Sequence, residues 1–521
     1  MGLNFIEWYK KKLKSEWKCA FFATFIIGML VHIYKFTNTL PNGDSIWNYY
    51  SDQNMIGSGR WFLSFACGIS SFFDLPWVNG LLAITFMAIA VAVVVEILQI
   101  KNKFVIALSA AVFVTFPAIT ETLQFEFTAD GYMIAMLLGA LSVYFSRIDE
   151  KRISRTVLSI VLLCLCCGIY QAYVSFAIVL ALLYFILLLA DNKYSNKEYW
   201  KYVLKQVIVI ASALVLYFVI WKICSAVQGV QASDYQGIDG LGFSIFTMIY
   251  AVPKTIKDIF VFFFERNLFS YGITAYGVLN ILFVASFIAG IIILIKKSKI
   301  YKRKISFVLL IVALVLIPFA VCVWHFTSNN IFYYTRMFQS LCLLYVFVAV
   351  VYDKYIKTKY ANIVAFLLMA IVFNNSISAN ISYFLINQSY EKTYYLGIEM
   401  MEDIEEVRKD NDNIKSIDIV GSRWVEVDQR HDLKSEKKFY NSTDFLYTLK
   451  KDYLIVEQVT YCFLDETFGL DLPLVDDDYS EKLSQSKEVD EMGVWPADDS
   501  IAVIDDVLVV KIGSVSTEDE K

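Results

Sequence analysis

The sequence predicts an α-helical polytopic membrane protein with about 11 transmembrane helices, followed by a small α/β domain outside the cytoplasm. Of its 521 residues 57% are hydrophobic, and the apolar residues gather in runs long enough to cross a bilayer. The charge is also split: residues 377–521 carry 15 Lys and Arg against 33 Asp and Glu, whereas the preceding residues carry 31 against 18. We therefore predict a membrane domain over residues 1–380 and an acidic, water-soluble domain over residues 381–521.

Each apolar run is interpreted as one transmembrane helix, and the first, which no small-residue cleavage site follows, is expected to remain in the protein. The predicted spans are residues 19–37, 77–99, 104–119, 131–147, 156–172, 174–191, 206–224, 273–295, 305–326, 337–352 and 361–378.

Basic residues predict the orientation of these spans. The N-terminus and every second connection together contain 24 Lys and Arg, whereas the other connections contain seven. The positive-inside rule then places the N-terminus in the cytoplasm of a cell whose plasma membrane the chain crosses repeatedly. An odd number of spans places the C-terminal domain outside. Residues 246–264 have apolar side chains at nearly helical spacing, and they fit either an interfacial helix or a re-entrant hairpin.

The C-terminal domain begins with a helical pattern, SYEKTYYLGIEMMEDIEEVRKD, and continues with the strand-like runs IKSIDIV, KDYLIVEQVTYCFL, SIAVI and VLVVKI. It contains one cysteine, Cys462, so no disulfide framework is expected. Asp476–Asp478 are interpreted as a solvated acidic loop. We predict no metal site, no cofactor and no nucleic-acid partner.

The first outer loop, residues 38–63, is polar and aromatic in an otherwise apolar region. Asp44 lies in a Pro-Asn-Gly-Asp turn, Asp52 follows, and Arg60 lies in a Gly-Arg-Trp element. A carboxylate, a guanidinium and aromatic rings at the mouth of a helix bundle can hold a sugar and an anionic phosphate. The alternative interpretation is a solvated loop with a turn aspartate and an interfacial tryptophan.

These residue types fit glycosyl transfer from a lipid carrier. A carboxylate, Asp44 or Asp52, would accept a proton from the acceptor hydroxyl, and Arg60 and Arg336 would bind the donor phosphate. The predicted sugar- or acceptor-binding residues are Trp47, Tyr49, Tyr50, Trp61, Glu126, Asp130, Tyr170 and Gln171. For Tyr170 and Gln171, packing in a tight turn is the stronger interpretation, and Glu126 and Asp130 fit either role.

The chain resembles the serotype-converting glucosyltransferases of the Gtr family, which are multi-spanning bacterial enzymes of the GT-C class. The resemblance rests on Asp44 in the first outer loop, Gly59-Arg60-Trp61, the segment FEFTADGY with Asp130, and the turn GIYQAYVSF with Tyr170 and Gln171. It covers roughly residues 1–380. A twin acidic pair of the class is absent, because Gly43 and Ser45 flank Asp44, and Asp52 therefore stays a rival base.

The resemblance implies that a sugar, commonly glucose, moves from an undecaprenyl-phosphate carrier to a surface polysaccharide or teichoic acid outside the cell. It also implies that the first-loop carboxylate, here Asp44, is the catalytic base. The expected partners are a polyprenyl-phosphate-linked sugar, a surface glycan or teichoic acid, the lipid bilayer, a donor synthase and a flippase.

Two other functions remain open at this point: a transporter or flippase of lipid-linked sugars, and a non-catalytic scaffold for envelope assembly. A transporter more often has charges near the middle of its spans and matching internal halves, which this sequence lacks. Lys35 and Glu96 lie near span ends, where their side chains are predicted to reach the interface. His32 and His325 are expected to make polar contacts rather than to bind a metal.

Overall fold

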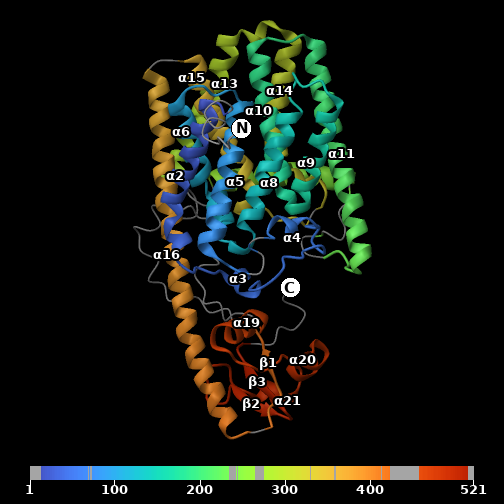
Figure 1. Cartoon of the computed structure of the whole chain (residues 1–521), viewed down its shortest axis with the longest axis vertical. Helices are drawn as coiled ribbons and strands as arrows, with labels where there is room; N and C mark the ends of the chain where they lie inside the picture. The colour runs from blue at the N-terminus through green and yellow to red at the C-terminus, as the bar shows by residue number, and fades with distance from the viewer. Residues whose placement is uncertain are drawn as a thin grey trace, which may run out of the picture.

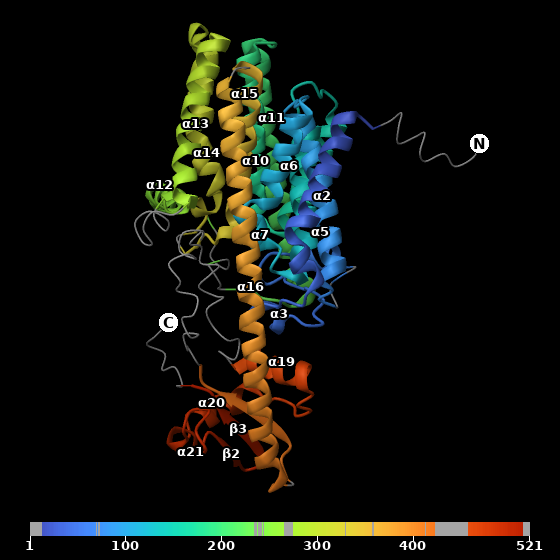
Figure 2. The ribbon, with the colours of Figure 1, turned by 90° about the vertical axis from the view of Figure 1, so that its left-hand side faces the viewer.

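The computed structural model describes residues 13–513, apart from residues 69, 71–72, 234–236, 238–241, 243, 265–274, 329, 357–358, 412 and 423–456. Figure 1 shows an elongated molecule with a helical bundle at one end and a small domain at the other. The helix α16 (Lys359–Lys409) runs along the bundle and continues to the small domain, as Figure 2 shows from the side.

The bundle is formed by long apolar helices, and each of the 11 predicted spans falls on one of them. They are α2 (Ser15–Thr37), α5 (Pro76–Ile97), α6 (Lys103–Thr115), α8 (Glu126–Phe145), α9 (Ile153–Ile169), α10 (Val174–Asp191), α11 (Asn196–Gln228), α13 (Ala275–Ser298), α14 (Lys304–Val321), α15 (Cys342–Tyr355) and α16. Within the described residues, nine helical segments are long and apolar enough to cross a membrane, while α6 and α9 are shorter. The described chain is therefore mostly helical, with helices of the length and composition that cross membranes, and the count of 11 crossings stays a prediction.

Short elements occupy the end of the bundle that faces the small domain (Figures 1 and 2). They are α3 (Gly43–Trp47), α4 (Leu63–Ala66), α7 (Pro117–Thr122) and the 3₁₀ helices η1 (Gln171–Tyr173), η5 (Val323–Phe326) and η6 (Thr335–Leu341). The basic connections between α10 and α11 and between α13 and α14, with the 3₁₀ helix η4 (Ile300–Lys302), lie at the opposite end.

Most of the segment 246–264, for which the sequence predicts an interfacial helix or a re-entrant hairpin, forms one helix, α12 (Ile245–Phe260). It packs against η5 and α14, and it leaves Phe246, Ile249 and Tyr250 exposed. A hairpin would need a turn inside this stretch, so the single helix favours the interfacial interpretation.

The C-terminal domain contains a three-stranded sheet in the order β1-β3-β2. Strand β1 (Ser416–Val420) runs parallel to β3 (Val507–Lys511), and β2 (Ile501–Ile504) pairs antiparallel with β3. These strands confirm the predictions for IKSIDIV, SIAVI and VLVVKI. The helices α20 (Asp477–Ser484) and α21 (Lys487–Glu491) complete the domain. The predicted opening helix is also confirmed, but it is the continuation of α16, with no break at residue 380.

The strand prediction for KDYLIVEQVTYCFL is wrong in its second half, and its first half, residues 451–456, lies outside the described residues. Residues Glu457–Phe468 form the helix α19. Its buried side chains are Val459, Thr460, Phe463 and Leu464. Their spacing places them on one face of a helix, and this periodicity outweighs the local content of β-branched and aromatic residues.

Candidate functional site

Asp44 lies on α3, a helix of five residues. The side chain of Asn42 caps it, since its Oδ1 accepts hydrogen bonds from Ser45 N at 2.8 Å and from Ser45 Oγ at 3.1 Å. The helix buries Ser45 and Ile46 and exposes Asp44 and Trp47. Over the described residues we find no hydrogen bond to the Asp44 carboxylate, so this group is accessible to a substrate.

Arg60 ends a tight turn that begins at Met55. Arg60 N donates to Met55 O at 3.0 Å, and Gly59 has a φ of +78°, a conformation that favours glycine. Side chains from two helices hold this turn through its carbonyl oxygens. The contacts are Gln171 Nε2 to Ser58 O at 2.7 Å, Tyr217 Oη to Gly59 O at 3.1 Å and Trp221 Nε1 to Ile56 O at 2.7 Å.

The Arg60 side chain extends over aromatic rings. Its guanidinium carbon lies 4.8 Å from the centre of the Tyr170 ring, and Nη1 donates to Tyr132 Oη at 3.2 Å. The rings of Tyr132 and Tyr170 stack at 4.5 Å. Nε of Arg60 is buried and has no hydrogen-bond partner in the described part of the chain. Nε of Arg60 is therefore an unsatisfied buried donor of this site.

Arg336 is a further cation at this end of the bundle, and it lies on η6. Its Nη1 donates to Glu121 Oε1 at 3.1 Å, and its guanidinium lies 4.4 Å from the ring centre of Phe125 and 4.5 Å from that of Tyr334. It also interacts electrostatically with Asp44 and Tyr170. The fold therefore gathers Asp44 and Arg60 of the first loop, Tyr170 and Arg336, which come from three separate segments of the chain, at one end of the bundle.

The other first-loop residues are placed differently. Asp52 is exposed, and its Oδ1 accepts a hydrogen bond from Asn54 N at 2.9 Å within a local turn. Trp47 and Tyr50 are 57% and 56% exposed, whereas the ring of Trp61 packs closely on Gly168, where a Cβ atom would lie 2.7 Å from it. Trp47 and Tyr50 can thus contact a substrate from solvent, while Trp61 fixes the loop to α9.

Glu126 and Asp130 are buried, and each has a partner inside the protein. Glu126 forms an ion pair with Lys35, and Asp130 Oδ2 accepts a hydrogen bond from Ser70 Oγ at 2.7 Å. The prediction that Lys35 reaches the interface is wrong: its side chain is 1% exposed, because the first loop covers the end of α2, and Nζ donates to Leu40 O at 2.5 Å. Both carboxylates hold neighbouring segments together.

Glu96, the other charge near a span end, pairs at 2.5 Å with Lys14 and accepts a hydrogen bond at 3.1 Å from Trp17 Nε1.

Three residues of this region were missed as site residues: Glu121, Tyr132 and Asp74. Glu121 is one of three acidic residues in the segment TETLQFEFTADG, and nothing in the sequence distinguishes it as the one that pairs with Arg336. Asp74 precedes α5, and burial, together with the nearby charge of Glu126, raises its pKa to about 7, against the opposing effect of Lys35.

The histidines make polar contacts, as predicted. His32 Nδ1 lies 2.8 Å from Tyr383 Oη and Nε2 lies 2.7 Å from Val114 O, while His325 Nε2 lies 2.7 Å from Asp258 Oδ2. Within the described ranges, no three His, Cys, Asp or Glu side chains form a group that could hold a metal ion.

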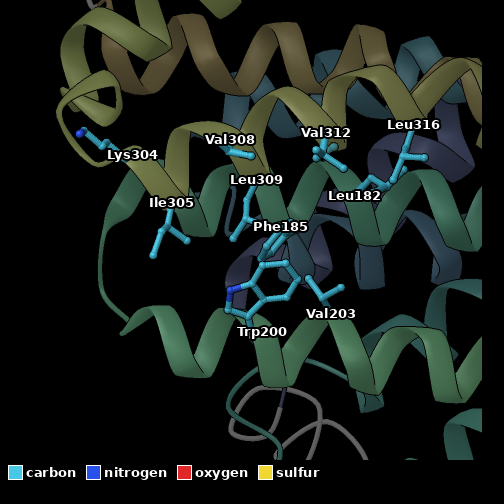
Figure 3. Close-up of a pocket in the computed structure, with 11 residues that line it drawn as sticks. Leu182, Phe185, Trp200, Val203, Lys304, Ile305, Val308, Leu309, Val312 and Leu316 are labelled. Atoms are coloured by element: carbon cyan, nitrogen blue, oxygen red, sulfur yellow. The ribbon is translucent and has the colours of Figure 1, made fainter.

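A groove of about 480 Å³ lies between α10, α11 and α14 at the basic end of the bundle (Figure 3). Its walls are apolar and include Phe185, Trp200 and Leu309, with Lys304 at one end. None of the predicted site residues line it, so it is separate from the cluster around Arg336.

Comparison with known proteins gives one match. A family model described as "Glucosyl transferase GtrII" matches residues 33–353. This range contains every predicted site residue from Asp44 to Arg336, and it ends before the C-terminal domain. No curated protein and no solved structure matches the chain.

Proposed function

Because this chain belongs to the GtrII glucosyl transferase family, we propose that it transfers a sugar, glucose in the first instance, from a polyprenyl-phosphate carrier to a surface glycan. One observation carries the proposal: Arg60 and Arg336 meet at the buried Tyr170, and the carboxylate of Asp44 is exposed at the same end of the bundle. A carboxylate for the acceptor hydroxyl and two cations for the donor phosphate are thereby gathered at one end of the bundle.

In the proposed reaction, the carboxylate of Asp44 accepts the proton of the acceptor hydroxyl while that oxygen attacks the anomeric carbon. The bond from the anomeric carbon to the phosphate oxygen breaks, and the configuration inverts. The departing polyprenyl phosphate is stabilised by the guanidinium groups of Arg336 and Arg60. Trp47 and Tyr50, which are exposed near Asp44 in sequence, offer apolar ring faces for a sugar.

The proposed location is the outer face of the cytoplasmic membrane. The basic connections lie at the end of the bundle opposite to Asp44, which supports an outer position for the site by the positive-inside rule. A lipid-linked donor suits that face, because nucleotide sugars are confined to the cytoplasm.

The test compares Asp44→Asn with Asp52→Asn, two exposed aspartates of one loop. Mass analysis of surface glycans should show that Asp44→Asn loses the added hexose, with transfer reduced by about 10²- to 10⁴-fold, while Asp52→Asn retains it. Purified Asp44→Asn protein should still bind polyprenyl-phosphate glucose. Loss only in Asp52→Asn would assign the base to Asp52, and full transfer by both variants would contradict the proposal.

A further inference from the structure

We propose that the C-terminal domain is part of the catalytic apparatus because it positions Asp44. This inference rests on the proposed role of Asp44 as the base. It concerns residues beyond 353, which the family model does not cover.

The first observation is the burial of Ile46, two residues after Asp44. Ile46 is fully buried, and it belongs to the hydrophobic core of the C-terminal domain rather than to that of the bundle. The contact is between α3 and α19, and Tyr49 packs against the same core. Other buried members of this core are Met400, Ile404, Phe463, Leu464 and Leu508.

The second observation concerns the chain before Asp44. Leu40 is fully buried in a cluster with four residues of α16, which are Ala379, Tyr383, Leu385 and Ile386. The apolar side chains on both sides of Asp44, Leu40 and Ile46, are thus buried against residues 379–512. A helix of five residues is too short to be stable alone, so these contacts determine where α3 lies.

The third observation is that the supporting domain is itself fixed to the bundle. Next to Leu40, α16 is joined to α2 by hydrogen bonds from Asn380 Nδ2 to Val31 O at 3.0 Å and between Tyr383 Oη and His32 at 2.8 Å. Farther along α16, Gly397 permits a close approach of α19, since a Cβ atom there would lie 2.5 Å from the Phe468 ring.

Trp495 Nε1 donates to Asp403 Oδ2 at 2.9 Å and ties the rest of the domain to the same helix. A continuous helix thus connects the bundle, which holds Arg336, to the domain that holds α3. This connection and the hydrogen bond from Asn42 Nδ2 to Gln124 O at 3.3 Å together hold α3 against the bundle. A small displacement of a reacting group is enough to reduce a rate strongly.

The experiment uses the full-length protein with Ile46→Ala, Phe463→Ala and their double variant. We expect kcat for transfer of labelled glucose from polyprenyl-phosphate glucose to cell-envelope fractions to fall by about 10- to 100-fold, with KM for the donor unchanged. The double variant should be no worse than the more impaired single one, because both variants act through the same hydrophobic core. Ile46→Leu should restore most of the rate, and Tyr395→Ala, which changes a 72% exposed side chain of α16, should leave it unchanged.

Hydrogen exchange provides a readout that does not depend on catalysis. Phe463→Ala should increase exchange in residues 43–47, whereas Tyr395→Ala should not. Unchanged kcat and exchange in Ile46→Ala and Phe463→Ala, with Asp44→Asn inactive, would overturn this inference and leave the proposed function in place. A raised KM with unchanged kcat would also overturn it, because the domain would then act in binding. Full activity of Asp44→Asn would instead reject the proposed function.

Discussion

The guanidinium of Arg60 lies 4.8 Å from the centre of the Tyr170 ring, and the hydroxyl group of Tyr170 interacts with Arg336. Arg60 and Arg336, which lie far apart in the sequence, therefore both interact with the buried side chain of Tyr170. Glu121 is the carboxylate that pairs with Arg336. In the proposed reaction both guanidinium groups would stabilise the departing dianionic phosphate, because each can direct donors at it and the aromatic surroundings strengthen the attraction.

Arg336→Lys retains the charge but loses the planar group that contacts Glu121 and two aromatic rings at once. We expect kcat/KM for polyprenyl-phosphate glucose to fall by about 100-fold. Steady-state kinetics with the purified protein measures this effect. Arg303→Lys is the matched control, because Arg303 hydrogen-bonds Leu189 O and lies at the other end of the bundle. Equal losses in both variants would mean that the effect is general destabilisation.

Gly59→Ala should displace the turn that carries Arg60. The added Cβ atom would lie 2.4 Å from Tyr217 Oη and 2.6 Å from Gln171 Nε2, the two side chains that hold the turn. Gly229→Ala is the control, because Gly229 also has a positive φ and the substitution costs about 1 kcal/mol of backbone strain. Its added Cβ atom would have no other atom within 4 Å. Transfer activity should therefore fall strongly for Gly59→Ala and little for Gly229→Ala, and similar activities would show that the turn geometry does not matter.

Lys35→Met should destabilise the protein by about 3–5 kcal/mol, because it leaves the carboxylate of Glu126 buried without its counter-ion. Thermal unfolding in detergent is the measurement. The double variant Lys35→Met/Glu126→Gln removes both charges and should recover most of the loss. If the double variant is less stable than Lys35→Met, the ion pair is not the source of the effect.

Asp74 should make stability depend on pH. Burial raises the pKa of its carboxyl from 3.8 to about 7, so between these values the unfolded chain has lost the proton that the folded chain keeps. The contribution of Asp74 to the free energy of unfolding should therefore fall as the pH rises from about 4 to about 7. Asp74→Asn should flatten the dependence in that interval, as measured by melting temperature against pH, and an unchanged profile would contradict the assignment.

The membrane helices could be predicted from the sequence because one property, the length of each apolar run, determines them. The convergence of residues at Arg336 could not be predicted in the same way. Asp44 and Arg60 stand out as unusual residues in a short loop, but their distance from Tyr170 and Arg336 depends on how α7, η1 and η6 pack. Glu121 shows the limit most clearly, since its neighbour in space lies more than 200 residues away.

The contact of the first loop with the C-terminal domain was also beyond sequence analysis. In the sequence Ile46 is one apolar residue in a polar loop, and no repeating pattern of apolar residues predicts that it packs in the same core as Phe463. The strand prediction over residues 457–464 failed for a different reason, because it followed the β-branched and aromatic content of this stretch and not the helical spacing of its apolar residues.

The uninterrupted course of α16 restricts how the gene can change. Each residue inserted into an α-helix turns everything after it by about 100° and advances it by about 1.5 Å. Between Ala379, which packs on the first loop, and Met400, which lies in the distal core, a single insertion or deletion would rotate the far domain away from Ile46. Relatives that keep this arrangement should therefore vary in amino-acid type along α16 while its length stays constant.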